Sequence, residues 1–267
     1  MPGGLLNIVA YGNQNVYLNG NPSKTFFKTT YKKYTNFGLQ KFRIDFDGLR
    51  NLRMTESSKF TFRMKRYAEL LMDTYLVVNL PTIWSPIYPP QDCSSNWAPY
   101  EFKWIDNLGT QMIEEIEISV GGQTLNRYSG AYLLAMMQRD FTTEKMALYD
   151  KMTGNVPELN DPGNVLPRVN AYPNAYYTSD VAGPEPSIHG RKLYIPINFW
   201  FTLAAKMAFP LVSLQYNELE INVTIRPVQE LVVIRDVTDS ANNYPYIQPN
   251  FNDSLQQFYR FLQPPPD

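Results

Sequence analysis

Alternation of apolar and polar residues with a period of two is the feature that most restricts how this chain folds. In residues 59–65, Phe60, Phe62 and Met64 alternate with lysines, a threonine and an arginine. Successive side chains leave a β-strand on opposite faces, so this pattern gives one buried face and one wet face. A helix would scatter both sets around its circumference. The segment is therefore predicted to be a strand.

Further segments alternate in the same way and are also predicted to be strands: residues 41–46, 115–120, 193–201 and 219–226. Pro196 cannot donate a hydrogen bond to a neighbouring strand, which places its strand at a sheet edge or a bulge. Residues 75–80 are almost wholly apolar and predict a strand covered on both faces, although a buried helical turn also fits. Residues 230–236 form one more candidate strand.

Helical patterns are confined to residues 130–138 and 144–152. Thr142 and Thr143 precede the second helix as candidate caps, and Gly154 follows it. Long connections rich in proline and asparagine occupy residues 81–99 and 155–190. Many strands, few helices and long connections predict an all-β chain, an antiparallel jelly-roll sandwich with short helices in its loops.

Charge and composition exclude several classes of partner. The chain has 24 Lys and Arg against 25 Asp and Glu, so no net positive charge attracts nucleic acid or anionic lipid over long range. Its first eleven residues lack the basic region of a signal peptide and are interpreted as an ordered arm. No apolar run approaches the roughly 20 residues that span a bilayer. We expect no direct contact with nucleic acid and no membrane insertion.

Candidate catalytic and metal-binding groups do not form a recognisable set. Jelly-roll enzymes that bind a metal need two or three histidines, and His189 is the only histidine of the chain. Cys93 has no histidine near it in sequence and, as the single cysteine, cannot form an internal disulfide. Glu115 and Glu117, beside Glu114, share the wet face of a predicted strand. We therefore predict no catalytic residue, no cofactor and no metal.

Three further patterns leave alternatives open. A stretch of interleaved lysines and aromatic residues fits a stacking platform for single-stranded nucleic acid or an amphipathic strand: Lys24, Phe26, Phe27, Lys28, Tyr31, Lys32, Lys33 and Tyr34. Asn222 and Asn252 occupy glycosylation sequons that we interpret as chance matches. Trp84, Trp97 and Trp104 lie in or near the first long loop and motivate a glycan-binding hypothesis.

Several runs resemble the major capsid proteins of giant and algal viruses, the nucleocytoplasmic large DNA viruses. The opening runs are Gly3-Gly4-Leu5-Leu6-Asn7-Ile8-Val9-Ala10-Tyr11-Gly12, Val16-Tyr17-Leu18, Gly20-Asn21-Pro22, Thr25-Phe26-Phe27-Lys28 and Tyr34-Thr35-Asn36-Phe37. Later runs are similar to strands of that family's first domain: residues 156–159, 193–201 and 208–218. The resemblance covers most of residues 3–226.

The resemblance implies a structural capsid protein in a virion, assembled in the host cytoplasm. Such a subunit has two consecutive jelly rolls, and three copies form a pseudo-hexagonal capsomer, a tile of an icosahedral shell over an inner membrane. Neighbouring capsomers and minor capsid proteins would be its other partners. The alternatives are a minor capsid paralogue or a glycan-binding jelly-roll module on the virion surface.

The same resemblance implies an organisation along the chain. Residues 1–23 would be an N-terminal arm beneath the capsomer, residues 24–236 the first jelly-roll domain, and residues 237–267 a linker toward a second jelly roll. The sequence stops where that second domain is expected to begin. We therefore expect this chain to be the first half of a double jelly roll.

Overall fold

The computed structural model describes residues 3–4, 7, 20, 33–48, 51–85, 100–177, 184–236, 238–254 and 256–264. The chain divides into two compact units, residues 1–42 and 43–267. In the first unit, residues 33–42 are exposed and have no regular secondary structure. Apart from four positions, the predicted arm at residues 1–23 lies outside the described residues, as does most of the lysine-rich stretch that follows.

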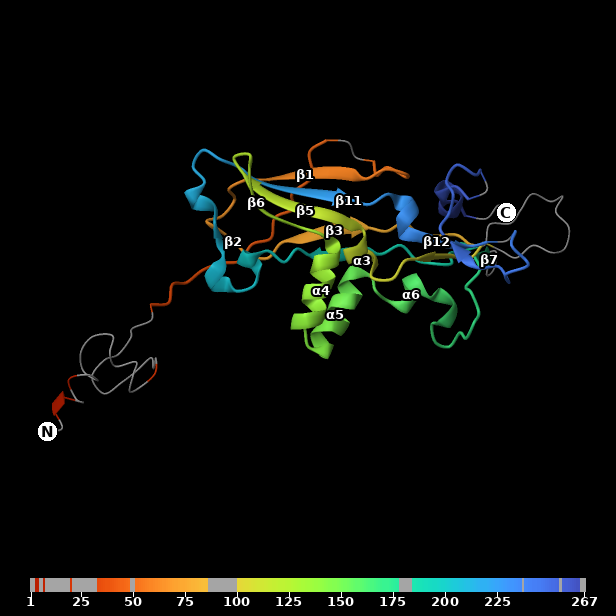
Figure 1. Cartoon of the computed structure of the whole chain (residues 1–267), viewed down its shortest axis with the longest axis horizontal. Coiled ribbons are helices and arrows are strands. Elements are labelled where there is room, and N and C mark those ends of the chain that lie inside the picture. The colour runs from red at the N-terminus through yellow and green to blue at the C-terminus, as the bar shows by residue number, and fades with distance from the viewer. Residues whose placement is uncertain are drawn as a thin grey trace. The chain divides into compact units, whose positions relative to one another are not determined.

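The second unit contains an antiparallel sheet of four strands, in the order β1–β11–β5–β6 (Figure 1). Its strands are β1 (Ser58–Met64), β5 (Ile113–Val120), β6 (Gln123–Tyr128) and β11 (Leu219–Ile225). In the register, Val223 of β11 lies between Phe60 of β1 and Ile116 of β5. Three of the predicted strands are thus confirmed, and they share one sheet.

The alternation in sequence becomes an alternation in burial. Along β11, Leu219, Ile221 and Val223 are at most 1% exposed, whereas the residues between them are half-buried. Each fully buried aliphatic side chain contributes about 1.5–3 kcal/mol through removal of apolar surface from water. A shift of the register by one residue would turn this whole set toward water, so the pattern fixes the pairing.

A smaller antiparallel sheet pairs β3 (Tyr75–Asn79) with β9 (Lys192–Pro196). The strand predicted over residues 193–201 is therefore too long, because the ladder ends at Pro196, which pairs with Tyr75 at the end of this two-stranded sheet. Alternate burial nevertheless continues to Phe199 and Phe201, which stack with ring centroids 5.3 Å apart. Packing thus preserves the pattern after the hydrogen bonds stop.

A third sheet joins β4 (Phe102–Trp104), β12 (Val232–Arg235) and β13 (Tyr246–Ile247). The strand predicted at residues 230–236 is confirmed by β12. The C-terminal segment does not leave the packed unit as a linker would, since Phe261 is 1% exposed and its ring centroid lies 5.1 Å from that of Phe102. A connection toward a second jelly roll stays a prediction.

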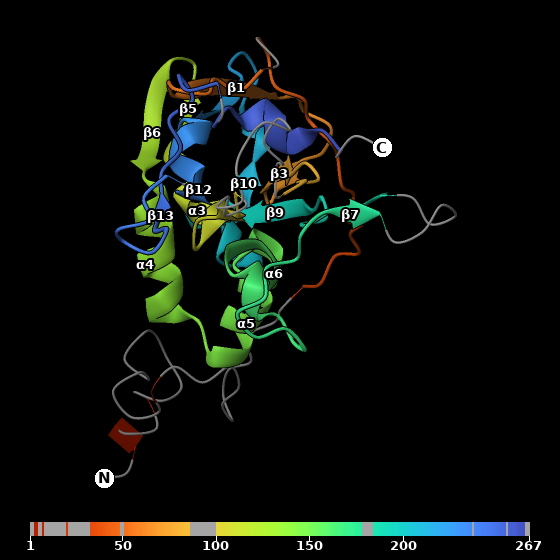
Figure 2. The same ribbon diagram turned by 90° about the vertical axis from the view of Figure 1, so that its right-hand side faces the viewer.

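The helices are short: α3 (Leu108–Gln111), α4 (Gly130–Asp140), α5 (Thr143–Thr153) and α6 (Pro157–Asn160). Both predicted helices are confirmed by α4 and α5, which lie on the same side of the four-stranded sheet (Figures 1 and 2). Gly154 ends α5 with φ 83°, a left-handed conformation that glycine adopts without steric cost. Thr142 is the N-cap, but its side chain makes no capping hydrogen bond.

The remaining elements are short and lie mostly within the long connections. The strands are β2 (Leu70–Leu71), β7 (Tyr176–Tyr177), β8 (Pro184–Glu185) and β10 (Phe209–Pro210). The 3-10 helices are η2 (Pro162–Asn164), η3 (Trp200–Thr202), η4 (Ala205–Met207), η5 (Leu211–Ser213), η6 (Val228–Leu231) and η7 (Phe258–Leu262). Tyr172 fixes the second long connection to β4, because its hydroxyl donates to the carbonyl of Phe102 at 2.7 Å.

Two of the predictions about strands are wrong. Residues 41–46 form no strand, since only Asp47, just beyond them, makes a bridge, to Thr61, and Phe46 instead packs edge-on against Phe60 at 4.9 Å. The strand β3 is not covered on both faces, because Tyr75 and Val77 are 46% and 48% exposed. The predicted sheet-rich class with few helices is confirmed, and the jelly-roll connectivity stays a prediction.

Candidate functional site

The outer face of the β3–β9 sheet carries exposed apolar side chains. Val77 lies directly opposite Tyr194 in the register, and these two side chains are 48% and 44% exposed. Tyr75 adds a third exposed side chain to the same face, while Leu76 and Ile195 turn to the opposite face and join the core. Directly opposite residues on one face lie close enough to form a continuous surface. We call this set, Tyr75, Val77 and Tyr194, the β3–β9 outer face.

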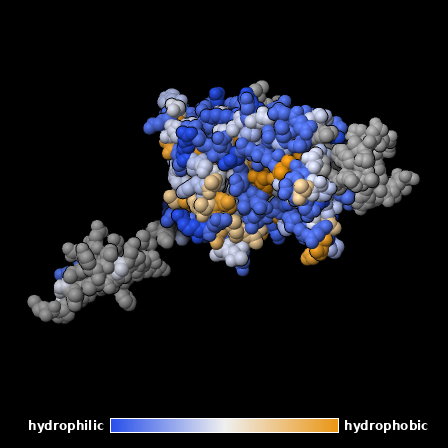
Figure 3. Space-filling view, turned by 45° about the vertical axis from the view of Figure 1, so that its right-hand side comes forward, coloured by the Kyte–Doolittle hydropathy of each residue, from blue (hydrophilic) through white to orange (hydrophobic). Residues whose placement is uncertain are grey.

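Exposed apolar surface of this kind marks sites of association more often than surface where apolar residues are scattered singly. Figure 3 shows that, on the face it views, apolar side chains gather in a few patches among mostly hydrophilic ones. Tyrosine and other aromatic residues are enriched in the cores of protein interfaces. The β3–β9 outer face therefore has the chemistry of a surface that another protein surface covers.

The outer face of the four-stranded sheet is polar, and its groups pair with one another. Arg63 Nε lies 3.2 Å from Glu220 Oε1, and Thr61 Oγ1 donates to Asn222 Oδ1 at 2.7 Å. Each of these pairs joins β1 to β11, because the partners are directly opposite in the register. This face satisfies its hydrogen bonds and charges without a partner molecule.

The carboxylates predicted to lie on a wet face are part of this network. Glu117 accepts a hydrogen bond from Thr124 Oγ1 at 2.5 Å and lies 3.8 Å from Lys59 Nζ. The hydrogen bond from Thr124 is the largest of the effects that hold the pKa of Glu117 below its ordinary value. Glu115 pairs with Arg127, and Glu114 is exposed. Glu115 and Glu117 are thus each paired with a basic side chain, which suits a solvated sheet face.

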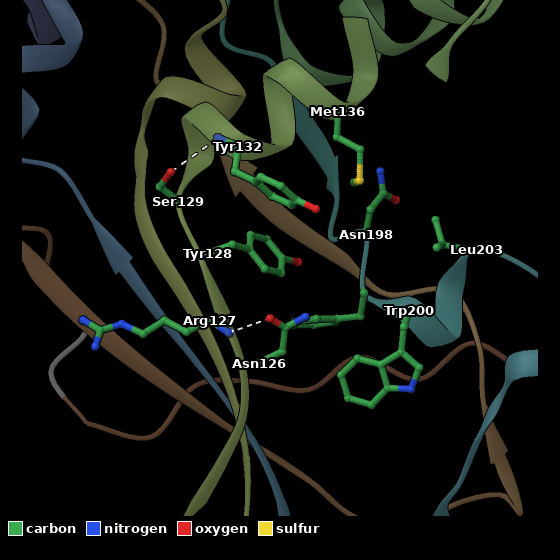
Figure 4. A pocket seen from close by; sticks show the side chains of 10 residues that line it. Asn126, Arg127, Tyr128, Ser129, Tyr132, Met136, Asn198, Trp200 and Leu203 are labelled. Carbon is green, nitrogen blue, oxygen red and sulfur yellow. Dashed lines mark hydrogen bonds between the residues drawn. The ribbon is translucent and has the colours of Figure 1, made fainter. Parts of the chain in front are cut away.

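A pocket of about 460 Å³ opens where the end of β6, the start of α4 and the segment leading into η3 meet (Figure 4). Its lining residues are Asn126, Arg127, Tyr128, Ser129, Tyr132, Met136, Asn198, Phe199, Trp200 and Leu203. Ser129 caps α4, because its Oγ accepts a hydrogen bond from the amide of Tyr132. That cap fixes the first turn of the helix and sets Tyr132 beside Tyr128.

Aromatic rings cluster at the pocket, although the ring of Phe199 is 0% exposed and belongs to the core behind it. The ring centroid of Tyr128 lies 5.7 Å from that of Tyr132 and 5.5 Å from that of Phe199. Trp200 continues the series, with its ring 6.3 Å from Phe199. Rings at these separations interact favourably in tilted and edge-on arrangements, so they support one another as a rigid surface.

The polar groups of the pocket are uncharged. The hydroxyl of Tyr128 is buried and has no hydrogen-bond partner among the described residues, and burial raises its pKa, so it stays protonated. Asn126 Oδ1 accepts from the amide of Arg127, while the Asn198 side-chain amide donates to Met137 Sδ. The guanidinium of Arg127 points away from the pocket and pairs with Glu115 (Figure 4). The pocket suits a neutral ligand with apolar surface.

No pattern in the sequence pointed to this pocket. Tyr128 lies between the strand predicted at residues 115–120 and the helix predicted at residues 130–138, which contains Tyr132, whereas Asn198 and Trp200 lie on the polar face of another predicted strand. These two segments meet only because the chain returns beside α4, and no periodicity within either segment predicts that meeting.

The isolated candidate residues do not assemble into a reactive site within the described part of the chain. His189 is exposed, and no group of three or more described His, Cys, Asp or Glu residues could hold a metal ion. Cys93 and Trp97 lie outside the described residues, and so does the interleaved lysine and aromatic stretch except for Lys33 and Tyr34, which are exposed. Among the helices that the structure describes, none has the length and apolar character required to cross a membrane.

The observation behind the glycan-binding hypothesis is weakened by the position of Trp104. Its side chain is 4% exposed and packs edge-on against Phe102 at 5.2 Å, so its ring is not available to stack on a sugar. Trp84 is half-buried. Asn222 lies within β11 and accepts the hydrogen bond from Thr61, whereas Asn252 is exposed.

Antiparallel sheets with one polar and one apolar outer face define a β-rich protein that offers surface for association. The family described as "Major capsid protein N-terminus" matches residues 25–262. The major capsid protein of Chrysochromulina ericina virus is 33% identical, over 96% of this chain and 47% of the viral protein. That of Phaeocystis pouchetii virus is 34% identical, over 86% and 42%. The chain therefore belongs to the major capsid protein family and matches its N-terminal part.

The chain spans less than half the length of these curated relatives. Capsid protein 1 of Acanthamoeba polyphaga mimivirus is 31% identical over 90% of this chain and 37% of its own length. Among solved structures, a chain of the PBCV-1 virus capsid covers 76% of this chain and 38% of itself, with 19% identity and a TM-score of 0.49.

Proposed function

We propose that this chain forms the first jelly roll of a capsid subunit and builds the icosahedral shell of a large DNA virus. The family match over residues 25–262 supports this function. The antiparallel sheets support it as well, because a jelly roll consists of two such sheets packed face to face. The chain would contribute surface and shape to the shell, and no chemistry.

In this proposal, three subunits form a capsomer with a pseudo-hexagonal outline. Each capsomer contacts neighbouring capsomers and minor capsid proteins, and the shell lies over an inner membrane without inserting into it. Assembly takes place in the host cytoplasm. The balance of 24 basic against 25 acidic residues supports a role without direct contact to the genome, since phosphate binding depends on excess positive charge.

The structural feature of this chain that best supports a role in assembly is the apolar β3–β9 outer face. A tile must bury surface on several sides, and a stable protein interface buries about 1,200–2,000 Å² in total. Tyr75, Val77 and Tyr194 offer apolar surface on a rigid sheet, where little conformational entropy is lost on association. The polar face of β1 and β11 pairs its own charged and hydrogen-bonding groups, so covering it with a partner would gain less.

Absence of catalysis is part of the proposal. Glu115 and Glu117 of β5 are paired with Arg127 and Lys59, and His189 is exposed. Nucleophilic or acid–base catalysis requires a nucleophile or base oriented by a second group within hydrogen-bond reach. Neither the four-stranded sheet nor the pocket at Tyr128 offers such a pair.

Electron cryomicroscopy of the parent virion tests the function directly. We expect density for this chain in the icosahedral shell, at a position repeated in each capsomer. Quantitative mass spectrometry of purified virions separates the principal tile, which would be the most abundant shell protein, from a minor paralogue. Absence of the chain from the shell would contradict the proposal.

A further inference from the structure

Among the described residues, the outer edge of β1 ends the four-stranded sheet without a full partner strand (Figure 1). Asp47 makes an isolated bridge to Thr61 of β1, in which its amide donates to the Thr61 carbonyl at 2.8 Å. The residues just before Asp47 have no regular secondary structure. We propose that residues 44–47 close onto this edge as a fifth strand when the subunit assembles. Because assembly is the trigger, this closure rests on the proposed function.

The existing bridge sets the register of the closed strand. Antiparallel strands run in opposite directions, so Asp45 would lie opposite Arg63, two positions from the bridge on each strand. Hydrogen-bonded pairs alternate with pairs that are not bonded, so the main-chain groups of Arg63 point to the same side as those of Thr61, away from β11. In the closed strand the Asp45 amide donates to the Arg63 carbonyl, and the Arg63 amide donates to the Asp45 carbonyl. Closure also covers an edge that would otherwise be open to pairing with other chains.

The apolar side chains of the segment already match the inner face of the sheet. Phe46 is half-buried and packs against the core, and its ring centroid lies 4.9 Å from that of Phe60 and 6.2 Å from that of Phe62. Alternate residues of a strand share a face, so Ile44 would follow Phe46 onto this inner face. In the closed register Ile44 lies opposite Met64, and both of these side chains are half-buried. Closure therefore places apolar residues against apolar residues.

The charged side chains of the segment match the polar outer face and show where the strand stops. Asp47 Oδ2 lies 3.4 Å from Arg63 Nε on that face. In the closed register Asp45 faces Arg63, so opposite charges meet there as well. One pair further along, Arg43 would face Lys65, and like charges directly opposite each other destabilise a sheet. The closed strand is therefore expected to stop short of Arg43.

The residues that precede the strand connect its closure to assembly. Tyr34, Phe37 and Leu39 are 86%, 82% and 75% exposed, and large side chains with this much apolar surface gain from burial. In a shell of identical subunits, a neighbouring copy is the surface that covers them. Ordering residues 44–46 costs backbone entropy, which favours the open segment in a single chain. Once a neighbour holds the preceding residues in place, less entropy remains to be lost when the strand closes.

Disulfide trapping tests the register in the 267-residue protein. Asp45→Cys with Arg63→Cys, in a chain that also carries Cys93→Ser, places two thiols on a directly opposite pair. The Cα atoms of such a pair lie about 5.5 Å apart in a closed ladder, a separation that a disulfide spans. The matched control combines Asp45→Cys with Lys59→Cys, which is on the same face of β1 but about 13 Å further along the strand. Under a mild oxidant we expect the first disulfide to form at least about tenfold faster than the control disulfide.

Hydrogen exchange tests the coupling to assembly. Mass spectrometry with fragmentation to single residues would compare the free 267-residue protein with purified virions. We expect the amides of Asp45 and Arg63 to exchange at least about tenfold more slowly in the virion, because closure places both in hydrogen bonds. The amide of Val223 is the control, since it lies within the ladder between β1 and β5 and should be protected in both samples.

Two results would overturn the closure. Equal trapping of the two cysteine pairs would show that the segment does not take this register on β1. Equal exchange of the Asp45 amide in the free protein and in the virion would show that assembly does not close the strand. Either result leaves the shell-forming function standing, because virion density tests that function separately.

Discussion

Two of the antiparallel sheets that enclose the core, the four-stranded sheet and the β3–β9 sheet, differ in what their outer faces present. The outer face of the four-stranded sheet is polar and exposed to water. Its side chains pair between neighbouring strands, as Arg63 does with Glu220 and Thr61 with Asn222. The β3–β9 sheet shows an apolar face that includes Val77 and Tyr194, each more than two-fifths exposed. Both sheets bury their inner faces in the same core.

Alternation along a strand therefore has two separate consequences. The apolar set of each strand is used by the chain's own core, and this use alone fixes the fold. The side chains that point away from the core are not constrained by core packing. Their polarity therefore indicates whether the outer face is covered by water or by another surface. A polar set meets water, whereas an apolar set on an exposed face indicates a partner surface.

The largest expected effect comes from the shared inner face. Ile221→Ala, in the middle of β11, should lower the free energy of unfolding by about 2–5 kcal/mol, because it leaves a cavity in a core position that is 1% exposed. Chemical denaturation followed by circular dichroism measures this change. A loss of less than about 1 kcal/mol would mean that the two sheets do not share a tightly packed core.

Tyr194→Lys should separate folding from association. The free energy of unfolding should change by only about 0.5 kcal/mol, since the side chain is 44% exposed, whereas assembly into capsomers should be lost because a charge would be buried in the interface. Sedimentation velocity of the assembling subunit measures the association. Tyr216→Lys is the matched control, since Tyr216 is 96% exposed in a connection. Equal assembly of both variants would contradict the assignment of the β3–β9 outer face.

Arg63→Ala tests whether the polar outer face of the four-stranded sheet is exposed to water and has no role in assembly. Arg63 lies 3.2 Å from Glu220 and 3.4 Å from Asp47, and its side chain is 56% exposed. Exposed pairs of this kind are worth about 0.2–1 kcal/mol, and salt screens them. We expect a loss in that range at low ionic strength that shrinks in 1 M salt, with assembly unchanged. Loss of assembly would show that this face too meets a partner.

The prediction with the smallest effect concerns the pKa of Glu117 on the polar outer face of the four-stranded sheet. Thr124→Ala should raise the pKa of Glu117 toward its ordinary value of 4.5, because the hydrogen bond from Thr124 favours the carboxylate. A lowered pKa in the folded state stabilises the fold above the unfolded pKa, and this contribution is lost as pH falls through the folded pKa. Titration by nuclear magnetic resonance would show the change, and an unchanged pKa would assign the shift to Lys59 instead.

Prediction from sequence succeeded where local pattern and packing agree. The strands around Phe60, Ile118 and Ile221 were all predicted from alternation, and Gly154 correctly marked the end of a helix. It failed at residues 41–46, where alternation is present but no neighbouring strand completes a ladder. A strand is stable only with a partner, and the partner is not encoded in the segment itself.

The candidate surfaces were less accessible to sequence analysis. An apolar run such as residues 75–80 has the same composition whether its second face meets the core or another protein, so coverage on both faces was the wrong prediction. The pocket at Tyr128 joins segments that are far apart in the chain. Proximity of this kind results from tertiary packing, which periodicity within a short window does not report.

Local periodicity and ordered runs of residues were enough to predict the sheet-rich class, most long strands, both principal helices and membership of the capsid family. The packing of residues 246–262 against β4 and β12, the burial of Trp104 in the core and the meeting of Tyr128 and Trp200 at one pocket emerge only in the folded chain. The physical reason is that burial is a property of the assembled sheets. A side chain is covered or exposed according to which distant segment lies over it, and burial of apolar surface in the core drives that arrangement.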